Sequence, residues 1–218
     1  MRPSLVIFDC DGVLVDSERL AAKSMEESLR MLGLDMTYAE IRRELVGLSW
    51  NDTIIKIEER LGSAVPEDWP QRAQQQDRER FLSDLQAVPG VRSVIDRLRS
   101  EAMPYCVASS GEPSKMNATL GATDMLHLFE GVMFSATMVE RGKPHPDLFL
   151  YAAEQMGHGP DGCVVIEDSV YGVRAGRAAG MRVFAYTGDP HSDEKTLAEA
   201  GGEPFADMAD LPRLLGLV

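Results

Sequence analysis

Short apolar runs separated by helical patterns recur along this chain, and this rhythm limits the possible folds more than any other feature. Each run is continuous rather than alternating, which is typical of strands that are covered on both faces of a sheet. Strand, helix and strand in repetition predict an α/β fold with a parallel sheet and helices on both of its faces. The runs lie at residues 4–9, 104–109, 131–135, 163–168 and 182–187, and the helical patterns at 91–100, 114–122, 147–157 and 170–180.

One long segment, residues 17–86, breaks this rhythm and contains no strand candidate. Amphipathic helical patterns follow one another there, separated by glycine and proline. We therefore expect an α/β core of residues 1–16 and 87–218 and an inserted α-helical cap domain of residues 17–86. Ligands bind beyond the carboxyl ends of parallel strands, so an insertion directly after the first strand is expected to form a lid. The expected cap helices cover residues 17–33, 37–46, 51–61 and 67–85.

Composition and charge exclude several classes of partner. The net charge is −13 over 218 residues and no basic cluster stands out, so a nucleic-acid backbone would be repelled. No apolar run is long enough to span a membrane and no signal peptide is identifiable, so we expect a soluble protein. Cys10, Cys106 and Cys163 are odd in number and far apart, which is consistent with reduced thiols in the cytoplasm. No heptad pattern is identifiable, which leaves the oligomeric state open and compatible with a monomer.

Acidic residues follow two of the expected strands. Asp9 ends the first apolar run, Asp11 comes next but one, and Gly12 lets the backbone turn sharply behind them. Glu167 and Asp168 end the fourth run. Because the carboxyl ends of parallel strands meet at one edge of a sheet, these carboxylates would repel one another there unless a cation joined them. Mg²⁺ suits a site at which carboxylates and a substrate phosphate share the coordination shell.

Groups that can hold an anion follow two other runs. Ser109 and Ser110 end the second run before a helical pattern, where hydroxyls and backbone N–H groups can bind phosphate. Lys143 comes after the third run as a cation. The simpler alternatives are that Ser110 caps the following helix and that Lys143 is a solvated surface residue. Asp9 or Asp11 taken singly would be a turn residue, and it is the combination of motifs that favours catalysis.

These residues, in this order around a helical insertion, resemble the haloacid dehalogenase superfamily, specifically its capped phosphatases. The motifs stand here as DCDGVLVDS at 9–17, Ser109, GKPHPDLF at 142–149 and VVIEDSVYGVRAGRAAGM at 164–181. The similarity covers the chain nearly from end to end and includes bacterial sugar phosphatases and relatives of β-phosphoglucomutase. It implies a Rossmann-like core carrying the helical cap.

The resemblance also implies a Mg²⁺-dependent phosphatase that works through a phosphorylated aspartate. Asp9 would attack phosphorus, and Asp11 would protonate the leaving group and then accept a proton from water. Mg²⁺ would be bound by Asp9, Asp168 and the backbone carbonyl of Asp11. Glu167 would be a further ligand, directly or through water.

The same resemblance suggests which residues contact the phosphate and the rest of the substrate. Lys143 and Ser109 would stabilise the phosphate oxygens. Trp50, together with Leu48 and Asn51, would line the cap side of the pocket, or Trp50 would instead anchor two cap helices.

The expected substrate is a small phosphorylated metabolite, with a sugar or sugar-acid phosphate ranked first. Related mutases usually carry a histidine early in the first cap helix, where this chain has Ala21, and an arginine where it has Trp50. A β-phosphoglucomutase-like mutase is the alternative, kept open by Glu167 before Asp168. A second alternative is a non-catalytic protein that binds phosphorylated metabolites on a decayed hydrolase fold.

Overall fold

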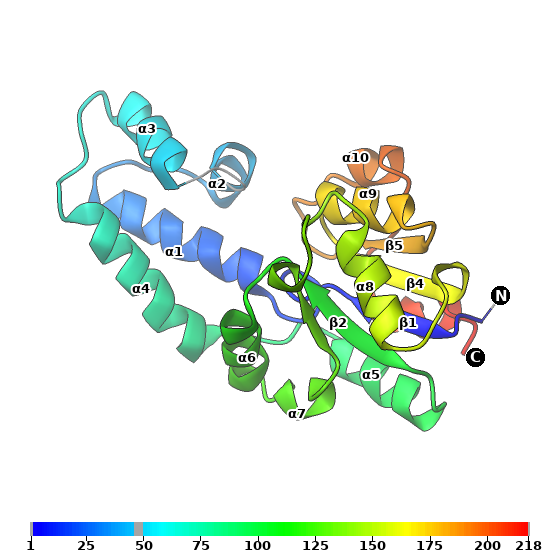
Figure 1. Ribbon diagram of the computed structural model, residues 1–218. Helices are drawn as coiled ribbons and strands as arrows, with labels where there is room; N and C mark the ends of the chain where they lie inside the picture. Colours follow the sequence, from blue (N-terminus) through cyan, green and yellow to red (C-terminus); the bar gives the residue numbers. More distant parts are fainter. Residues whose placement is uncertain (1, 46–49, 218) are drawn as a thin grey trace. The chain divides into compact units, whose positions relative to one another are not determined.

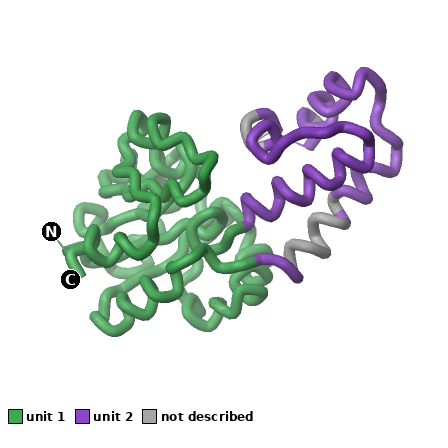
Figure 2. Tube along the Cα trace, turned by 180° about the vertical axis from the view of Figure 1, so that it is seen from behind, with its two compact units in different colours: residues 1–16, 86–218 green, residues 17–85 purple. Residues whose placement is uncertain are grey.

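The structure, a computed structural model, describes residues 2–45 and 50–217 (Figure 1). The chain divides into two compact units, residues 1–16 with 86–218, and residues 17–85 (Figure 2). The expected domains differ from these units only at Gln86, which was expected in the cap. The Gln86 carbonyl accepts a hydrogen bond from the Asp16 N–H at 2.9 Å, so this residue is tied to the α/β unit.

The first unit contains a six-stranded sheet in the order β3-β2-β1-β4-β5-β6, and every neighbouring pair of strands is parallel. The predicted α/β fold with a parallel sheet is therefore confirmed. The strands are β1 (Leu5–Phe8), β2 (Tyr105–Ser109), β3 (Met133–Ser135), β4 (Cys163–Glu167), β5 (Arg182–Tyr186) and β6 (Glu203–Phe205).

Strand β6 is an element that the apolar runs did not predict. It is a short edge strand with Pro204 at its centre and an exposed Glu203. Proline cannot donate a ladder hydrogen bond and is confined to such edges. An edge strand of this composition has no continuous apolar run, because only part of it is covered.

Helices cover both faces of the sheet. Alternate strand residues point to opposite faces, and Ile7 and Val165 pack on one face in a buried cluster with Phe149 of α8 and Val173 of α9. Helix α5 buries the apolar residues of one of its sides, and Figure 1 shows it on the other side of the sheet from α8. The helices of this unit are α5 (Val91–Ser100), α6 (Pro113–Ala122), α7 (Leu126–Phe129), α8 (Asp147–Gln155), α9 (Val170–Ala178), α10 (Glu194–Glu199) and α11 (Leu211–Leu214).

The central strand β1 fixes the position of the predicted nucleophile. Phe8, its last residue, lies opposite Val107 of β2 and Ile166 of β4. The Asp9 N–H donates to the Ile166 carbonyl at 2.9 Å. Asp9 therefore leaves the sheet between the ends of its two neighbours, where a side chain can meet residues from both.

In its described part, the second unit consists of helices joined by short loops, and it has a core of its own. The Trp69 indole N–H donates to the Ser28 carbonyl at 3.4 Å, and an ion pair of 2.7 Å joins Arg60 to Glu44. The buried residues of this core are Ala22, Leu29, Met36, Ile41, Leu45, Ile57, Trp69 and Ala73. The helices are α1 (Ser17–Met31), α2 (Tyr38–Glu44), α3 (Trp50–Leu61) and α4 (Trp69–Asp84).

Two further expectations concern membranes and thiols. Among the described residues, none of the helices has the length and apolar character needed to cross a membrane. Cys10, Cys106 and Cys163 are buried, free cysteines.

Candidate active site

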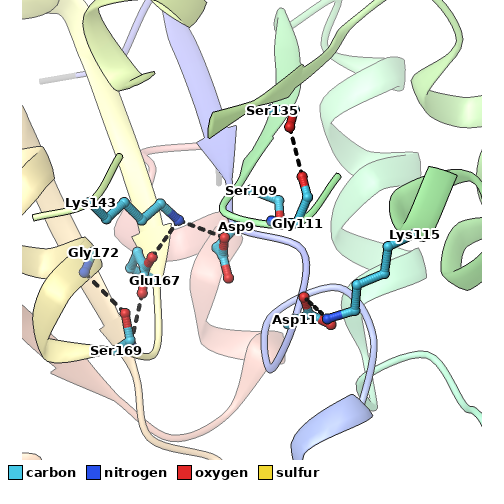
Figure 3. A network of polar contacts seen from close by, with 10 residues as sticks. All are labelled: Asp9, Asp11, Ser109, Gly111, Lys115, Ser135, Lys143, Glu167, Ser169 and Gly172. Atoms are coloured by element: carbon cyan, nitrogen blue, oxygen red, sulfur yellow. Dashed lines mark hydrogen bonds and ion pairs between the residues drawn. The ribbon is translucent and has the colours of Figure 1, made fainter. Parts of the chain in front are cut away.

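The centre of the site is an ion-paired carboxylate at the end of β1. Asp9 is buried, and its Oδ1 accepts a hydrogen bond from the Lys143 ammonium at 2.6 Å. The same ammonium donates to Glu167 Oε1 at 2.7 Å (Figure 3). The Lys143 side chain is 4% exposed and lies over the Phe149 ring, 4.9 Å from its centroid. The alternative of a solvated surface lysine is therefore wrong, because the loop after β3 turns this side chain inward between two acids.

Glu167 supports this lysine from the end of β4. Its side chain is completely buried, with Oε1 on Lys143 and Oε2 accepting the Ser169 N–H at 2.7 Å. Ser169 in turn caps α9, since its hydroxyl accepts the Gly172 N–H at 3.0 Å. Both Glu167 oxygens thus have protein partners, which adds a positioning role to the metal-ligand role expected from sequence.

Three carboxylates nevertheless converge closely enough to share a cation. One ligand oxygen each from Asp9, Glu167 and Asp168 lie within 4.8 Å of one another. Carboxylate oxygens are the donors that Mg²⁺ prefers, and a cation would offset their mutual repulsion. The donor set therefore fits a divalent cation. The Asp11 carboxylate is not in this group, and the expected role of the Asp11 backbone carbonyl as a ligand stays a prediction.

Burial and the close approach of these charged groups shift the pKa values of Asp9 and Lys143. Burial raises the pKa of Asp9 to about 7, with Lys143 opposing the rise and Glu167 adding to it. Burial works to lower the pKa of Lys143, but the carboxylates of Asp9 and Glu167 raise it above its usual value. Lys143 is therefore a cation here. A divalent cation beside Asp9 would favour the ionised carboxylate that a nucleophile requires.

The turn after β2 carries the predicted phosphate-binding serines. The buried Ser109 Oγ accepts the Gly111 N–H at 3.0 Å, and the Ser135 hydroxyl donates to the Gly111 carbonyl at 2.8 Å. A hydroxyl that accepts one hydrogen bond can still donate one, so Ser109 can serve a phosphate oxygen. Ser110 is exposed and does not cap α6, whose N-cap is Glu112. The alternative that Ser110 caps this helix is therefore wrong, because residues 109–111 form a hydrogen-bonded turn and the helix begins only at Pro113.

Asp11 lies on the other side of Asp9 from Lys143 and has a cation of its own (Figure 3). The Lys115 ammonium, from α6, is 2.8 Å from Asp11 Oδ2. The Asp11 side chain is 22% exposed, so it is more open to solvent than Asp9. The two aspartates of the first motif thus have separate cationic partners.

Two glycines make room for the acids. A Cβ atom on Gly12, which has a φ of +77°, would lie 2.0 Å from Asp168 Oδ2. A Cβ atom on Gly172 would lie 1.7 Å from Glu167 Oε1. The Glu167 carboxylate therefore rests directly on the backbone of the first turn of α9.

Gly172→Ala should lower kcat by about 100-fold, because the displaced Glu167 would no longer hold Lys143 on Asp9. The matched control is Gly121→Ala in α6, where a Cβ atom meets nothing within 4 Å. This control should keep its activity and raise the free energy of unfolding by about 0.5–1 kcal/mol. Phosphate-release assays and urea unfolding measure both effects. Wild-type kcat in Gly172→Ala would contradict this account of Glu167.

Trp50 belongs to the core of the helical unit. Its ring stacks on Trp69, with ring centroids 6.0 Å apart and planes 11° apart. This contact matches the alternative in which Trp50 anchors two helices, since α3 and α4 meet there. The expected pocket residue Leu48 lies outside the described residues, as does the side chain of Asn51.

Comparison with known proteins decides the family. Residues 6–186 match the haloacid dehalogenase-like hydrolase family. The chain belongs to this family. Among curated haloacid dehalogenase-like hydrolases, it is 30% identical to 6-phosphogluconate phosphatase of Escherichia coli K12 over 214 residues, 98% of this chain and 95% of that protein. It is also 30% identical to the phosphorylated carbohydrates phosphatase of Thermotoga maritima, over 96% of this chain and 97% of that one.

Solved structures of haloacid dehalogenase-like hydrolases agree. A crystal structure of a family member from Deinococcus radiodurans R1, with bound phosphate and sodium, has a TM-score of 0.92 and 30% identity, covering 100% of this chain and 98% of that chain. The predicted family membership is thus confirmed.

Sequence reasoning missed Lys115, Ser135 and Gly172 in this haloacid dehalogenase-like site. Ser135 and Gly172 act through backbone contacts, which leave no signature in composition. Lys115 could have been found from the sequence. A cation in the first turn of a helix is unfavourable beside the helix dipole, which indicates that it pairs with an acidic group.

Proposed function

We propose that this protein is a Mg²⁺-dependent phosphatase that hydrolyses a small phosphorylated metabolite, a sugar or sugar-acid phosphate, through a phosphorylated Asp9. One observation carries the proposal. Asp9 is a buried carboxylate at the end of the central strand, 2.6 Å from Lys143 and grouped within 4.8 Å of oxygens from Glu167 and Asp168.

The predicted enzyme class, a hydrolase of phosphoric monoesters, is confirmed by the family and by relatives that are themselves phosphatases. The finer choice of a sugar or sugar-acid phosphate is supported by the names of these relatives, which refer to 6-phosphogluconate and to phosphorylated carbohydrates.

In the first step, an Asp9 carboxylate oxygen bonds to phosphorus while the bond from phosphorus to the ester oxygen breaks. Asp11 gives its proton to that oxygen, so the leaving group departs as an alcohol. In the second step, water attacks phosphorus and gives a proton to Asp11. Phosphate leaves, and the Asp9 carboxylate is restored.

The other residues hold the phosphoryl group during both steps. Lys143 lies beside the attacking carboxylate and can stabilise the oxygens of the transferring group, as can the Ser109 hydroxyl. A divalent cation bound by Asp9, Asp168 and the Asp11 carbonyl, with Glu167 nearby, would offset the charge between carboxylate and phosphate.

Removal of divalent cations should lower phosphate release by at least about 100-fold, because the site would then hold more carboxylates than cations. A panel of sugar and sugar-acid phosphates, assayed with EDTA and after readdition of MgCl₂, measures this. We expect phosphate release that returns with Mg²⁺. Equal release in EDTA would contradict the metal assignment. Conversion of β-glucose 1-phosphate to glucose 6-phosphate without phosphate release would favour the mutase alternative.

A further inference from the structure

We propose that Lys115 is a positioning residue that holds the Asp11 carboxyl group in place for proton transfer to the leaving group. The inference rests on the proposed function and deepens it, since it assigns a second lysine to the site. Lys143 serves the phosphoryl group at Asp9, and Lys115 serves the ester oxygen through Asp11.

The geometry separates these two tasks. The Lys143 ammonium donates hydrogen bonds to Asp9 and Glu167, whereas the Lys115 ammonium lies 2.8 Å from Asp11 Oδ2. Figure 3 shows Lys143 on one side of Asp9, and Lys115 with Asp11 on the other. Both members of the second pair pack against Gly111, with Lys115 Cδ 3.4 Å and Asp11 Oδ2 3.9 Å from the position of a Cβ atom there. The turn after β2 therefore fixes where the pair meets.

Helix stability does not explain a lysine at this position. Lys115 is the third residue of α6, two positions after Pro113, and a cation in this first turn opposes the helix dipole. The Lys115 side chain is 49% exposed, and ion pairs of such exposure add little to folding stability. A pairing that spans 104 positions of sequence and stabilises little is better explained by a task at Asp11.

The first chemical step indicates how Lys115 would assist Asp11. As Asp11 passes its proton to the ester oxygen, its carboxyl group becomes a carboxylate, and the Lys115 ammonium pairs with the charge that develops. Lys115 keeps its own protons throughout. Its contribution therefore depends on whether the leaving group needs a proton. An alkoxide from a sugar phosphate needs one, whereas p-nitrophenolate departs as an anion.

Lys115→Met should lower kcat/KM for the best sugar phosphate of the panel by about 30-fold, and for p-nitrophenyl phosphate by less than about 3-fold. The loss should fall on kcat, and Lys115→Arg should restore most of it because it keeps the cation. Lys195→Met is the matched control, since Lys195 also pairs with an acid but its side chain is 85% exposed on α10. It should keep wild-type rates with both substrates.

A double-mutant cycle separates positioning from direct contact with substrate. If Lys115 acts through Asp11, adding Lys115→Met to Asp11→Asn should cause no further loss. Equal losses with both substrates, a rise in KM alone, or an additive loss in the Asp11→Asn background would overturn the inference. Failure of the proposed function is distinguishable, because it would show as phosphate release that Asp9→Asn leaves unchanged.

Discussion

Replacing Asp9 with asparagine should lower kcat for sugar phosphates by at least about 10⁴-fold, because an amide cannot attack phosphorus as a carboxylate can. Folding should survive the change. Asparagine is nearly the same size, Lys143 keeps Glu167 as a partner at 2.7 Å, and burial already disfavours the ionised form of Asp9, whose pKa it raises.

Phosphate release, together with the melting temperature of the variant, measures this prediction. A residual rate at the uncatalysed background and an unchanged melting temperature are expected. Equal rates in Asp9→Asn and wild type would instead favour the alternative of a non-catalytic protein that binds phosphorylated metabolites.

Lys143→Met should have the next largest effect, and it should affect both activity and stability. kcat should fall by about 10³-fold, because the transferring phosphoryl group loses a preorganised cation. The variant should also lose about 3 kcal/mol of unfolding free energy, since Asp9 and Glu167 would be left buried together without their ammonium.

Urea unfolding with and without MgCl₂ measures the second effect. Added Mg²⁺ should recover part of the lost stability by taking over the charge of the missing ammonium. The exposed-pair variant Lys195→Met should leave both kcat and unfolding unchanged. A Lys143→Met protein as stable and as active as wild type would contradict the reading of Lys143 as a buried cation of the site.

The sequence predicted the parts of the fold that depend on burial. Parallel strands covered on both faces must be apolar throughout, so β1, β2 and β4 were visible as continuous runs, and Asp9 and Glu167 as their polar ends. β6 was not visible, because an edge strand that contains Pro204 needs no such run. The helical unit could be predicted because its helices are amphipathic and are separated from one another by glycines.

The pairing of individual side chains was harder to predict. That Lys143 joins Asp9 to Glu167 depends on how the loop after β3 turns, and the sequence left a solvated lysine open. The contact of Lys115 with Asp11 depends on the turn at Gly111. The periodicity of apolar residues does not determine either turn. The residues of the site could therefore be predicted, but the hydrogen bonds and ion pairs between them could not.

Trp50 illustrates the same limit in the helical unit. The sequence left two roles open, and the structure places the ring against Trp69. Stacking of two indoles depends on how α3 and α4 pack, which residue spacing within either helix does not determine. A role for Trp50 in substrate selection stays a prediction.

The most direct test of the account is the covalent state of Asp9 during turnover. The enzyme would be quenched in acid while hydrolysing its best substrate, and its peptides examined by mass spectrometry, with Asp9→Asn as the control. We predict one phosphoryl group on Asp9 in the wild type and none in the variant. An active enzyme that never carries phosphate on Asp9, or carries it on another residue, would contradict the account.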